Sequence, residues 1–268
     1  DAGFVSGHED ASFALAFARI ENHYFVNGGF FDADEIKDVL AVLWFLADPL
    51  SGFKIYKDST FAMMREAAKR GHRIFAFEQK DMALEEGIVT ADVAEITLTG
   101  EADEWYTVAG QESTRLAEFD AIIERKDPPF DMEYVYLTQL LDLAEAQGAR
   151  VFNKPSAIRA HNEKLSIAQF SHFTSPTLVS SDAARLRAFH ALHRDVIFKP
   201  LDGMGGTGIF RVKDDGMNLG SVIETLTELG ARTIMAQKYI PAIVHGDKRV
   251  LVIDGKPVPF ALARIPQA

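Results

Sequence analysis

The chain has 268 residues, of which 47% are hydrophobic, and this is ordinary for a globular protein with one large or two modest domains. Its formal net charge of −11 argues against nucleic-acid binding, because phosphate backbones repel a surface of like charge. The absence of cysteine excludes disulfides, thiolate nucleophiles and cysteine-ligated metals. The longest apolar run, residues 39–47, is far shorter than the roughly 20 residues of a membrane-spanning helix. We therefore expect no nucleic-acid or membrane partner. The composition leaves the compartment open, and a cytoplasmic location is compatible with it.

Strand and helix patterns alternate along the first half of the chain. We predict strands at residues 39–47, 72–77, 121–124 and 150–152, and helices at residues 60–70 and 132–146. Strands separated by helices of this length are typical of parallel βαβ units and of an α/β fold. In open sheets of this kind ligands bind at the carboxyl ends of the strands, where Asp48 and the loop at residues 125–130 lie.

The second half of the chain has the pattern of a mixed α+β domain. We predict strands at residues 195–199, 209–213, 233–238 and 249–254, and a helix at residues 221–229. The dipeptide Asp254-Gly255 between two apolar runs is a hairpin signal, so antiparallel pairs are expected. We place the domain boundary between residues 155 and 163. This assigns residues 39–158 to the first domain and residues 159–268 to the second.

A glycine-rich stretch at residues 203–208 follows one of these strands. It formally matches the G-x-G-x-x-G fingerprint of dinucleotide-binding proteins, but that fingerprint requires a helix after it. The alternating residues 209–213 predict a strand instead, and no Gly-Lys-Ser/Thr ends the run as in a P-loop. The backbone N–H groups of a glycine loop between two strands can converge on a phosphate. A flexible hairpin loop without a ligand is the alternative.

Two lysines belong to the same half of the chain as this loop. Lys199 ends the strand directly before the loop, where its ammonium group can reach a phosphate held by the backbone, and Lys164 begins a predicted helix. A lone lysine is usually solvated, so the spacing leaves both interpretations open. Asp202 and Asp247 can hold a metal or orient a lysine, although a turn aspartate is the commoner explanation for each.

Two arginines lie at or in apolar strands near the end of the sequence. They are Arg249 and Arg264. An arginine flanked by apolar strand residues often binds an anion, since an unpaired guanidinium there is costly. An internal ion pair of either arginine, for instance with Asp247 or Glu224, is the equally weighted alternative.

Short strings throughout the sequence match one protein family in family order, from about residue 43 to residue 267. The strings are Ala47-Asp48-Pro49, Lys57-Asp58-Ser59-Thr60-Phe61-Ala62-Met63, Arg125-Lys126-Asp127-Pro128-Pro129-Phe130-Asp131, Val151-Phe152-Asn153-Lys154-Pro155, Asn162-Glu163-Lys164-Leu165, the loop 199–206, Met235-Ala236-Gln237-Lys238-Tyr239, Gly246-Asp247-Lys248-Arg249-Val250 and Leu262-Ala263-Arg264-Ile265-Pro266-Gln267. At these strings the chain resembles the bacterial glutathione synthetases, which belong to the ATP-grasp superfamily.

The resemblance implies a fold and a reaction. The fold is an N-terminal parallel βαβ domain of the pre-ATP-grasp type, followed by an incomplete α+β ATP-grasp domain. ATP would phosphorylate the glycine-accepting carboxylate of γ-glutamylcysteine. The amine of glycine would then attack the acyl phosphate to give glutathione, ADP and phosphate. Phosphoryl transfer depends on positioning and on neutralising charge, which suits the lysines and arginines described above.

The resemblance also implies roles for individual residues. The residues implied at the nucleotide are Lys164, Lys199, Asp202, Gly203, Met204, Gly205, Gly206, Gln237, Lys238, Tyr239 and Ile240, the last four of them lining the adenine pocket. Arg249 and Arg264 would be catalytic, because they would stabilise the transferring phosphoryl group and the acyl phosphate. Ser59, Arg125 and Asp127 would face the peptide substrate.

The end of the sequence departs from the family pattern. In the family, Arg-Ile-Pro-Gln is followed by a glycine-rich loop and by strands that carry the Mg²⁺ ligands, whereas this sequence stops at Ala268. We therefore expect ATP and Mg²⁺ as cofactors by resemblance, but no metal-binding residues within this sequence. We predict a ligase by descent whose 268-residue form is inactive alone. A non-catalytic nucleotide-binding remnant is the alternative function. The family's tendency to form tetramers leaves a homo-oligomer open.

The start of the sequence departs from the family as well. Residues 7–25 are similar to a segment of the proline iminopeptidases, which are α/β-hydrolases, and we assign residues 1–38 to a remnant of that kind. No G-x-S-x-G elbow occurs in the sequence, so the serine nucleophile of such a peptidase is missing. An aminopeptidase function is therefore nearly excluded.

Overall fold

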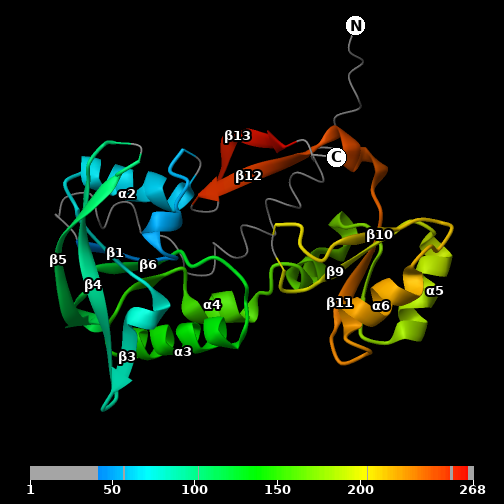
Figure 1. Cartoon of the computed structure of the whole chain (residues 1–268), viewed down its shortest axis with the longest axis horizontal. Coiled ribbons are helices and arrows are strands. Elements are labelled where there is room, and N and C mark those ends of the chain that lie inside the picture. The colour runs from blue at the N-terminus through cyan, green and yellow to red at the C-terminus, as the bar shows by residue number, and fades with distance from the viewer. Residues whose placement is uncertain (1–41, 57, 102, 204, 254–255, 265–268) are drawn as a thin grey trace, which may run out of the picture. The chain divides into compact units, whose positions relative to one another are not determined.

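The computed structural model describes residues 42–56, 58–101, 103–203, 205–253 and 256–264 (Figure 1). The described chain divides into two compact units, one that ends at Ala160 and one that begins at His161. The predictions for residues 1–38, for Met204 and for the turn at residues 254–255 lie outside the described residues.

The first unit is built on a seven-stranded sheet with the order β3-β4-β2-β1-β6-β7, in which β5 pairs with β4. Its strands are β1 (Val42–Leu46), β2 (Arg73–Phe77), β3 (Met82–Glu85), β4 (Ile88–Leu98), β5 (Tyr106–Arg115), β6 (Ala121–Glu124) and β7 (Val151–Phe152). Its helices are α2 (Ser59–Lys69), α3 (Met132–Ala146) and α4 (Pro155–Ala160), with short 3-10 turns η1 (Leu50–Gly52), η2 (Gln79–Asp81) and η3 (Leu116–Glu118). The pairs β2-β1, β1-β6 and β6-β7 are parallel, and β3, β4 and β5 are antiparallel to their neighbours.

Strand β1 lies between β2 and β6 and is buried on both faces. Because side chains alternate along a strand, Trp44 and Leu46 enter one core together with residues of α3, and Leu43 and Phe45 enter another together with residues of α2. The Trp44 ring is stacked between Phe75, at 4.1 Å between centroids, and Phe119, at 3.5 Å. Helices on both faces therefore hold the central strands rigidly, and the loops at their carboxyl ends start from fixed points.

The second unit contains a four-stranded antiparallel sheet with the order β10-β9-β11-β8. The strands are β8 (Thr177–Ser180), β9 (Val196–Pro200), β10 (Phe210–Val212) and β11 (Ile234–Lys238), and the helices are α5 (Ala183–His193) and α6 (Leu219–Thr227). The 3-10 segments η4 (Leu165–Phe173) and η5 (Pro241–His245) and the antiparallel pair β12 (Asp247–Ile253) and β13 (Lys256–Arg264) complete the unit.

Both helices of the second unit cover the same face of its sheet. Val196 and Phe198 of β9 and Ile234 and Ala236 of β11 form one core with residues of α5 and α6. Side chains alternate, so the residues between them, Lys199 among them, lie on the face that α5 and α6 leave uncovered.

The α/β fold class and most predicted elements are confirmed, but the first sheet is not purely parallel. The sequence analysis predicted neither the hairpin of β4 and β5 nor α5. The residues of β5 are mostly exposed and polar, so they lack the apolar alternation that identifies a strand in a sequence. They form a strand because they pair with β4. No described helix is long and apolar enough to cross a bilayer.

Candidate functional site

The uncovered face of the second sheet carries several of the predicted nucleotide-binding residues. Lys199 lies opposite Met235 in the pairing of β9 with β11, and Gln237 lies opposite Ile197 two positions further along. Arg211 of β10 is opposite Ile197 as well, so it belongs to the same face. The antiparallel register therefore brings Lys199, Gln237 and Arg211 together from three strands.

Lys199 is a cation that its surroundings do not neutralise. Burial lowers the pKa of its ammonium group to about 8, the nearby charge of Lys164 lowers it further, and Glu163 opposes the change. Within the described part of the chain, its side chain forms no hydrogen bond or ion pair. A half-buried ammonium group beside a second lysine forms a place where an anion is stabilised.

The glycine loop is attached to the start of the second unit by side chains. Lys164 donates a short hydrogen bond to the carbonyl oxygen of Gly203. Asn162 donates to the carbonyl oxygen of Leu201 at 3.2 Å, and its own side-chain oxygen accepts from the backbone N–H of Lys164 at 3.0 Å. Sequence reasoning missed Asn162, although an asparagine two residues before Lys164 is typical of a local capping turn.

The loop itself depends on glycine for its backbone conformation. Gly205 and Gly206 have φ values of 64° and 85°, in the left-handed region, and a Cβ atom at either position would meet no atom within 4 Å. The requirement is therefore conformational and does not arise from packing. The space around these glycines leaves the loop open to an approaching anion.

Asp202, at the start of this loop, has a partner that the sequence did not indicate. Nη2 of Arg232 donates to both carboxylate oxygens of Asp202, at 2.7 and 2.9 Å, and Nη1 donates to Glu228 at 3.1 Å. The pair raises the pKa of the Arg232 guanidinium. The carboxylate of Asp202 is therefore matched by an arginine, and its contact with a nucleotide stays a prediction.

The predicted adenine segment follows β11. The side-chain amide of Gln237 donates to Oγ1 of Thr177 at 2.9 Å, and the backbone N–H of Lys238 donates to the carbonyl oxygen of Pro176 at 2.9 Å. The guanidinium of Arg211 lies 3.5 Å from the ring centroid of Tyr239. Ile240 is exposed. These contacts fix the segment's backbone and leave its adenine contacts as predictions.

Arg211 is held over Tyr239 by a second interaction. Its guanidinium donates to both carboxylate oxygens of Asp195, at 2.9 and 2.7 Å. This pairing raises the pKa of Arg211 and lowers that of Asp195. The sequence analysis did not single out Arg211, although a polar residue between Phe210 and Val212 in an alternating strand was a usable signal.

The two predicted catalytic arginines lie on the pair of β12 and β13. Arg249 is exposed and lies opposite Leu262, and the backbone of Arg264 lies opposite Asp247. Among the described residues Arg249 forms no ion pair, so neither of the internal pairs considered for it is present. The side chain of Arg264 is outside the described part, and the catalytic roles of both arginines stay predictions.

The first unit brings the three predicted peptide-binding residues together at one cavity. Its volume is about 390 Å³, and Ser59, Arg125 and Asp127 all line it. Nη2 of Arg125 donates to Oγ of Ser59 at 2.8 Å, and Nε donates to Oγ1 of Thr60 at 3.1 Å. The cavity lies where β1 and β6 end, as expected for ligands of an open parallel sheet.

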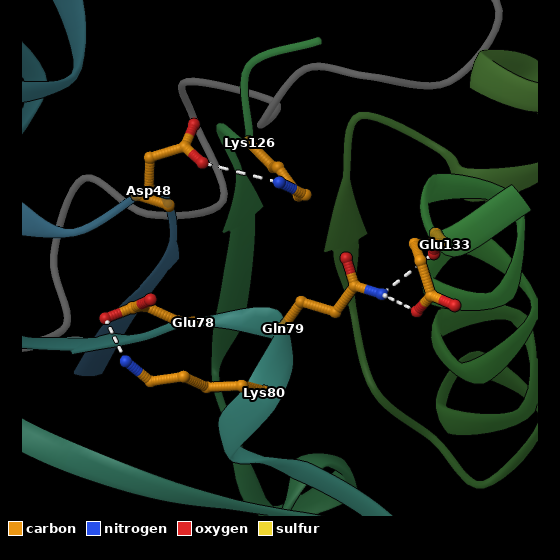
Figure 2. A pocket seen from close by; sticks show the side chains of 7 residues that line it. Asp48, Glu78, Gln79, Lys80, Lys126 and Glu133 are labelled. Atoms are coloured by element: carbon orange, nitrogen blue, oxygen red, sulfur yellow. Dashed lines mark hydrogen bonds and ion pairs between the residues drawn. The ribbon is translucent and has the colours of Figure 1, made fainter. Parts of the chain in front are cut away.

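Asp48 is shared between this cavity and a second one of about 300 Å³. It accepts from the backbone N–H of Asp127 at 2.7 Å. It also accepts from Nζ of Lys126 at 3.3 Å (Figure 2). Figure 2 also shows Lys80 with Glu78 and Gln79 with Glu133 around the second cavity. Burial and the neighbouring charge of Asp48 raise the pKa of Asp127.

A buried carboxyl group supports the loop that carries Arg125. Glu124, at the end of β6, is 4% exposed; it accepts from the backbone N–H of Lys126 at 2.9 Å and lies 3.0 Å from the hydroxyl of Tyr134. Burial raises the pKa of Glu124 to about 7 and raises that of Tyr134. The sequence analysis read residue 124 only as the end of a strand, because nothing in the sequence marks it as buried.

A metal site is not present within the described part of the chain. No three histidine, aspartate or glutamate side chains gather there in a way that could hold a metal ion. The described residues therefore do not fit a Mg²⁺ site of their own.

Comparison with known sequences covers both units. The description "Prokaryotic glutathione synthetase, N-terminal domain" matches residues 42–159, and "Prokaryotic glutathione synthetase, ATP-grasp domain" matches residues 163–268. A glutathione synthetase of Ralstonia nicotianae is 63% identical over 224 residues, which cover 84% of this chain and 69% of that relative. A glutathione synthetase of Neisseria meningitidis serogroup A is 56% identical over 227 residues, which cover 83% of this chain and 71% of the relative.

Solved structures show the same fold. The D-cycloserine synthetase DcsG is similar with a TM-score of 0.56 at 16% identity, over 84% of this chain and 72% of that one. A RimK domain ATP-grasp protein from Sphaerobacter thermophilus is similar with a TM-score of 0.50 at 21% identity, over 79% of this chain and 69% of that one. The sequence matches and the shared fold agree, and the chain belongs to the prokaryotic glutathione synthetases, a family of ATP-grasp ligases.

Proposed function

We propose that this protein joins γ-glutamylcysteine to glycine at the expense of ATP, giving glutathione, ADP and phosphate. Family membership supports the reaction, and the observation that carries the nucleotide part is the uncompensated ammonium group of Lys199 beside the glycine loop. In the proposed order, the cysteinyl carboxylate attacks the γ-phosphorus of ATP and ADP leaves. The amine of glycine then attacks the acyl phosphate, and phosphate leaves from the carbonyl carbon.

Lys199 and Lys164 have the chemistry to bind the phosphates of ATP. Each ammonium group is stabilised by an anion, because the two like charges and the burial of Lys199 are otherwise unfavourable. The open backbone around Gly205 and Gly206 can add N–H donors to the same oxygens. We assign Asp202 and Asn162 to holding this loop in place, since both are engaged in hydrogen bonds with neighbouring parts of the unit.

The peptide substrate is assigned to the cavity of the first unit. Ser59, Arg125 and Asp127 line that cavity and offer a hydroxyl, a guanidinium and a carboxylate to one small molecule. A volume of about 390 Å³ lies within the range of about 300–1,000 Å³ that is usual for small-molecule sites. The catalytic roles of Arg249 and Arg264, a role for Mg²⁺, the cytoplasmic location and the assembly into oligomers are parts of the proposal that rest on the family alone.

The experiment that tests the proposal measures nucleotide binding and turnover on the same protein. We expect ATP to bind, and ADP to be released only when γ-glutamylcysteine and glycine are both present, with glutathione formed in equal amount. Lys199→Met should weaken ATP binding by about 10- to 150-fold, because a hydrogen bond to a charged group contributes about 1.5–3 kcal/mol. Lys213→Met, at an exposed lysine of the same unit, is the matched control.

Two results would contradict the proposal in different ways. ATP binding without glutathione formation would reduce the function to nucleotide binding. Equal ATP affinity in Lys199→Met and Lys213→Met would remove the phosphate site from the uncovered face of the second sheet.

A further inference from the structure

The cavity of the first unit contains charges of both signs that do not neutralise each other. Its lining includes Arg125 together with the carboxylates of Asp48, Asp58 and Asp127. Arg125 and Asp127 are close enough for the guanidinium to lower the pKa of the carboxyl, yet they form no ion pair. A cation and an anion on one wall, held apart, suit a ligand that carries both charges itself.

Arg125 supplies the site for the ligand's anion. Its guanidinium is directed by hydroxyl groups, with Nη2 donating to Ser59 at 2.8 Å and Nε donating to Thr60 at 3.1 Å. In the described part of the chain it has no carboxylate partner. Hydroxyl partners fix the orientation of the guanidinium without neutralising it, so its remaining N–H groups are available to a ligand carboxylate.

Asp127 supplies the site for the ligand's cation. Asp48 accepts from Lys126 and from the backbone N–H of Asp127, and Asp58 accepts from the backbone N–H of Phe61 at the start of α2. Asp127 has no such partner for its carboxylate within the described residues. Its pKa is raised by burial and by Asp48 and Asp58, and a ligand ammonium group relieves that repulsion.

We propose that this cavity recognises the free α-amino acid head of the γ-glutamyl residue, with its α-carboxylate on Arg125 and Ser59 and its α-ammonium group on Asp127. This assignment rests on the proposed function, since it takes γ-glutamylcysteine as the substrate. The head is the end of the dipeptide that carries both charges and takes no part in the reaction. The cysteinyl carboxylate at the other end is the group that is phosphorylated.

The test compares γ-glutamylcysteine with two analogues, by calorimetric binding to the whole protein without ATP. Glutarylcysteine lacks only the α-amino group, and 4-aminobutanoylcysteine lacks only the α-carboxylate. Each analogue should bind at least about tenfold more weakly than the dipeptide, because it leaves one charged partner in the cavity unsatisfied.

Variants then assign each half of the head to its partner. In Arg125→Gln, the dipeptide and 4-aminobutanoylcysteine should bind equally weakly, while the discrimination against glutarylcysteine persists. In Asp127→Asn, the dipeptide and glutarylcysteine should bind equally weakly, while the discrimination against 4-aminobutanoylcysteine persists. Arg70→Gln, at the exposed residue that follows the last residue of α2, is the control and should keep both preferences. The fluorescence of Trp44 and Trp105, both buried in the first unit, shows whether each variant is folded.

The outcomes separate this inference from the proposed function. If the dipeptide binds and glutathione forms, but the analogues bind as tightly as the dipeptide, the inference is wrong and the function stands. An unchanged KM for γ-glutamylcysteine in folded Arg125→Gln and Asp127→Asn would have the same meaning. Failure of the dipeptide to bind, together with the absence of glutathione formation, would overturn the function and this inference with it.

Discussion

In the first unit, both cations at the carboxyl edge of β6 already have oxygen partners, whereas Lys199 in the second unit has none among the described residues. Arg125 contacts Ser59 and Thr60, and Lys126 contacts Asp48. Lys199 is half-buried beside Lys164, and its pKa is lowered to about 8. Oxygen partners thus orient the two cations of the first unit, while the ammonium group of Lys199, proposed to bind phosphate, has no partner in the described part of the chain.

This difference predicts that substitutions act differently in the two units. A partnered group can be replaced only by a side chain that keeps its partners, so its loss affects stability. A half-buried charged group without a partner lowers the stability of the fold. Its removal should therefore weaken ligand binding and slightly stabilise the protein.

The largest effect is expected at Glu124. Its pKa is raised from 4.5 to about 7, so the folded protein holds the proton more tightly than the unfolded chain does. Stability from this proton is fully present below about pH 4.5 and is lost as the pH rises through about 7. The difference between a pKa of 4.5 and one of about 7 corresponds to about 3 kcal/mol. Glu124→Gln keeps the acceptor for Lys126 and should abolish this pH dependence.

Urea unfolding followed by tryptophan fluorescence measures this effect, because both tryptophans of the chain lie in the first unit. The free energy of unfolding of the wild type should fall between pH 5 and pH 8 relative to Glu124→Gln. Parallel curves for the two proteins would show that Glu124 is ionised at no cost in the folded state.

The second prediction concerns the pH dependence of ATP binding. The proposed phosphate contact requires the protonated ammonium group of Lys199, whose pKa is about 8 without a ligand. The affinity for ATP should therefore fall by up to about tenfold per pH unit above pH 8, where this group loses its proton. Lys199→Met should bind ATP weakly and show little change between pH 7 and pH 9. Its second unit should also be slightly more stable than in the wild type, since a half-buried charge is removed.

Binding titrations of ATP at pH 7, 8 and 9 provide the measurement, with Lys213→Met as control. A wild-type affinity that stays constant up to pH 9 would show that Lys199 does not contact the phosphates in its protonated form.

These predictions depend on residues that differ in how far the sequence revealed them. Lys199 could be predicted, because it follows an apolar strand and precedes a glycine loop, and both features are local. Glu124 could not, because its burial depends on Tyr134 and on the packing of α3, which no local pattern reports. The pairing of Asp202 with Arg232 joins residues 30 positions apart, and only the antiparallel sheet brings them together.

The fold divides in the same way. The strands β1, β2 and β6 could be predicted because they are buried on both faces and appear as continuous apolar runs. Strand β5 could not, because its exposed residues carry no periodic signal and the pairing with β4 alone makes them a strand. The roles of individual site residues stay predictions, since they depend on ligands as well as on the fold.

A third, smaller effect is expected at Asn162. Its side chain donates to Leu201 and accepts from the backbone N–H groups of Lys164 and Leu165, so it joins the glycine loop to the segment that carries Lys164. Asn162→Ala should weaken ATP binding by about five- to tenfold, the equivalent of about one hydrogen bond. Asn162→Asp keeps the acceptor but not the donor. Its affinity for ATP should lie between those of the wild type and Asn162→Ala if the contact with the glycine loop matters. Equal affinities in all three proteins would make the contact irrelevant to binding.

The smallest effect is expected at Arg211, and it separates the base from the phosphates. Arg211 lies 3.5 Å from the ring centroid of Tyr239 and is held there by Asp195, at the segment assigned to adenine. An exposed cation–π contact contributes about 0.5–1 kcal/mol, so Arg211→Gln should weaken ATP binding by about two- to fivefold. Tripolyphosphate, which has no base, should bind the variant and the wild type equally, because the lysines are unchanged. If the variant loses affinity for both ligands alike, Arg211 acts on the phosphates, and the boundary between the base and phosphate regions on this sheet must be moved toward β10.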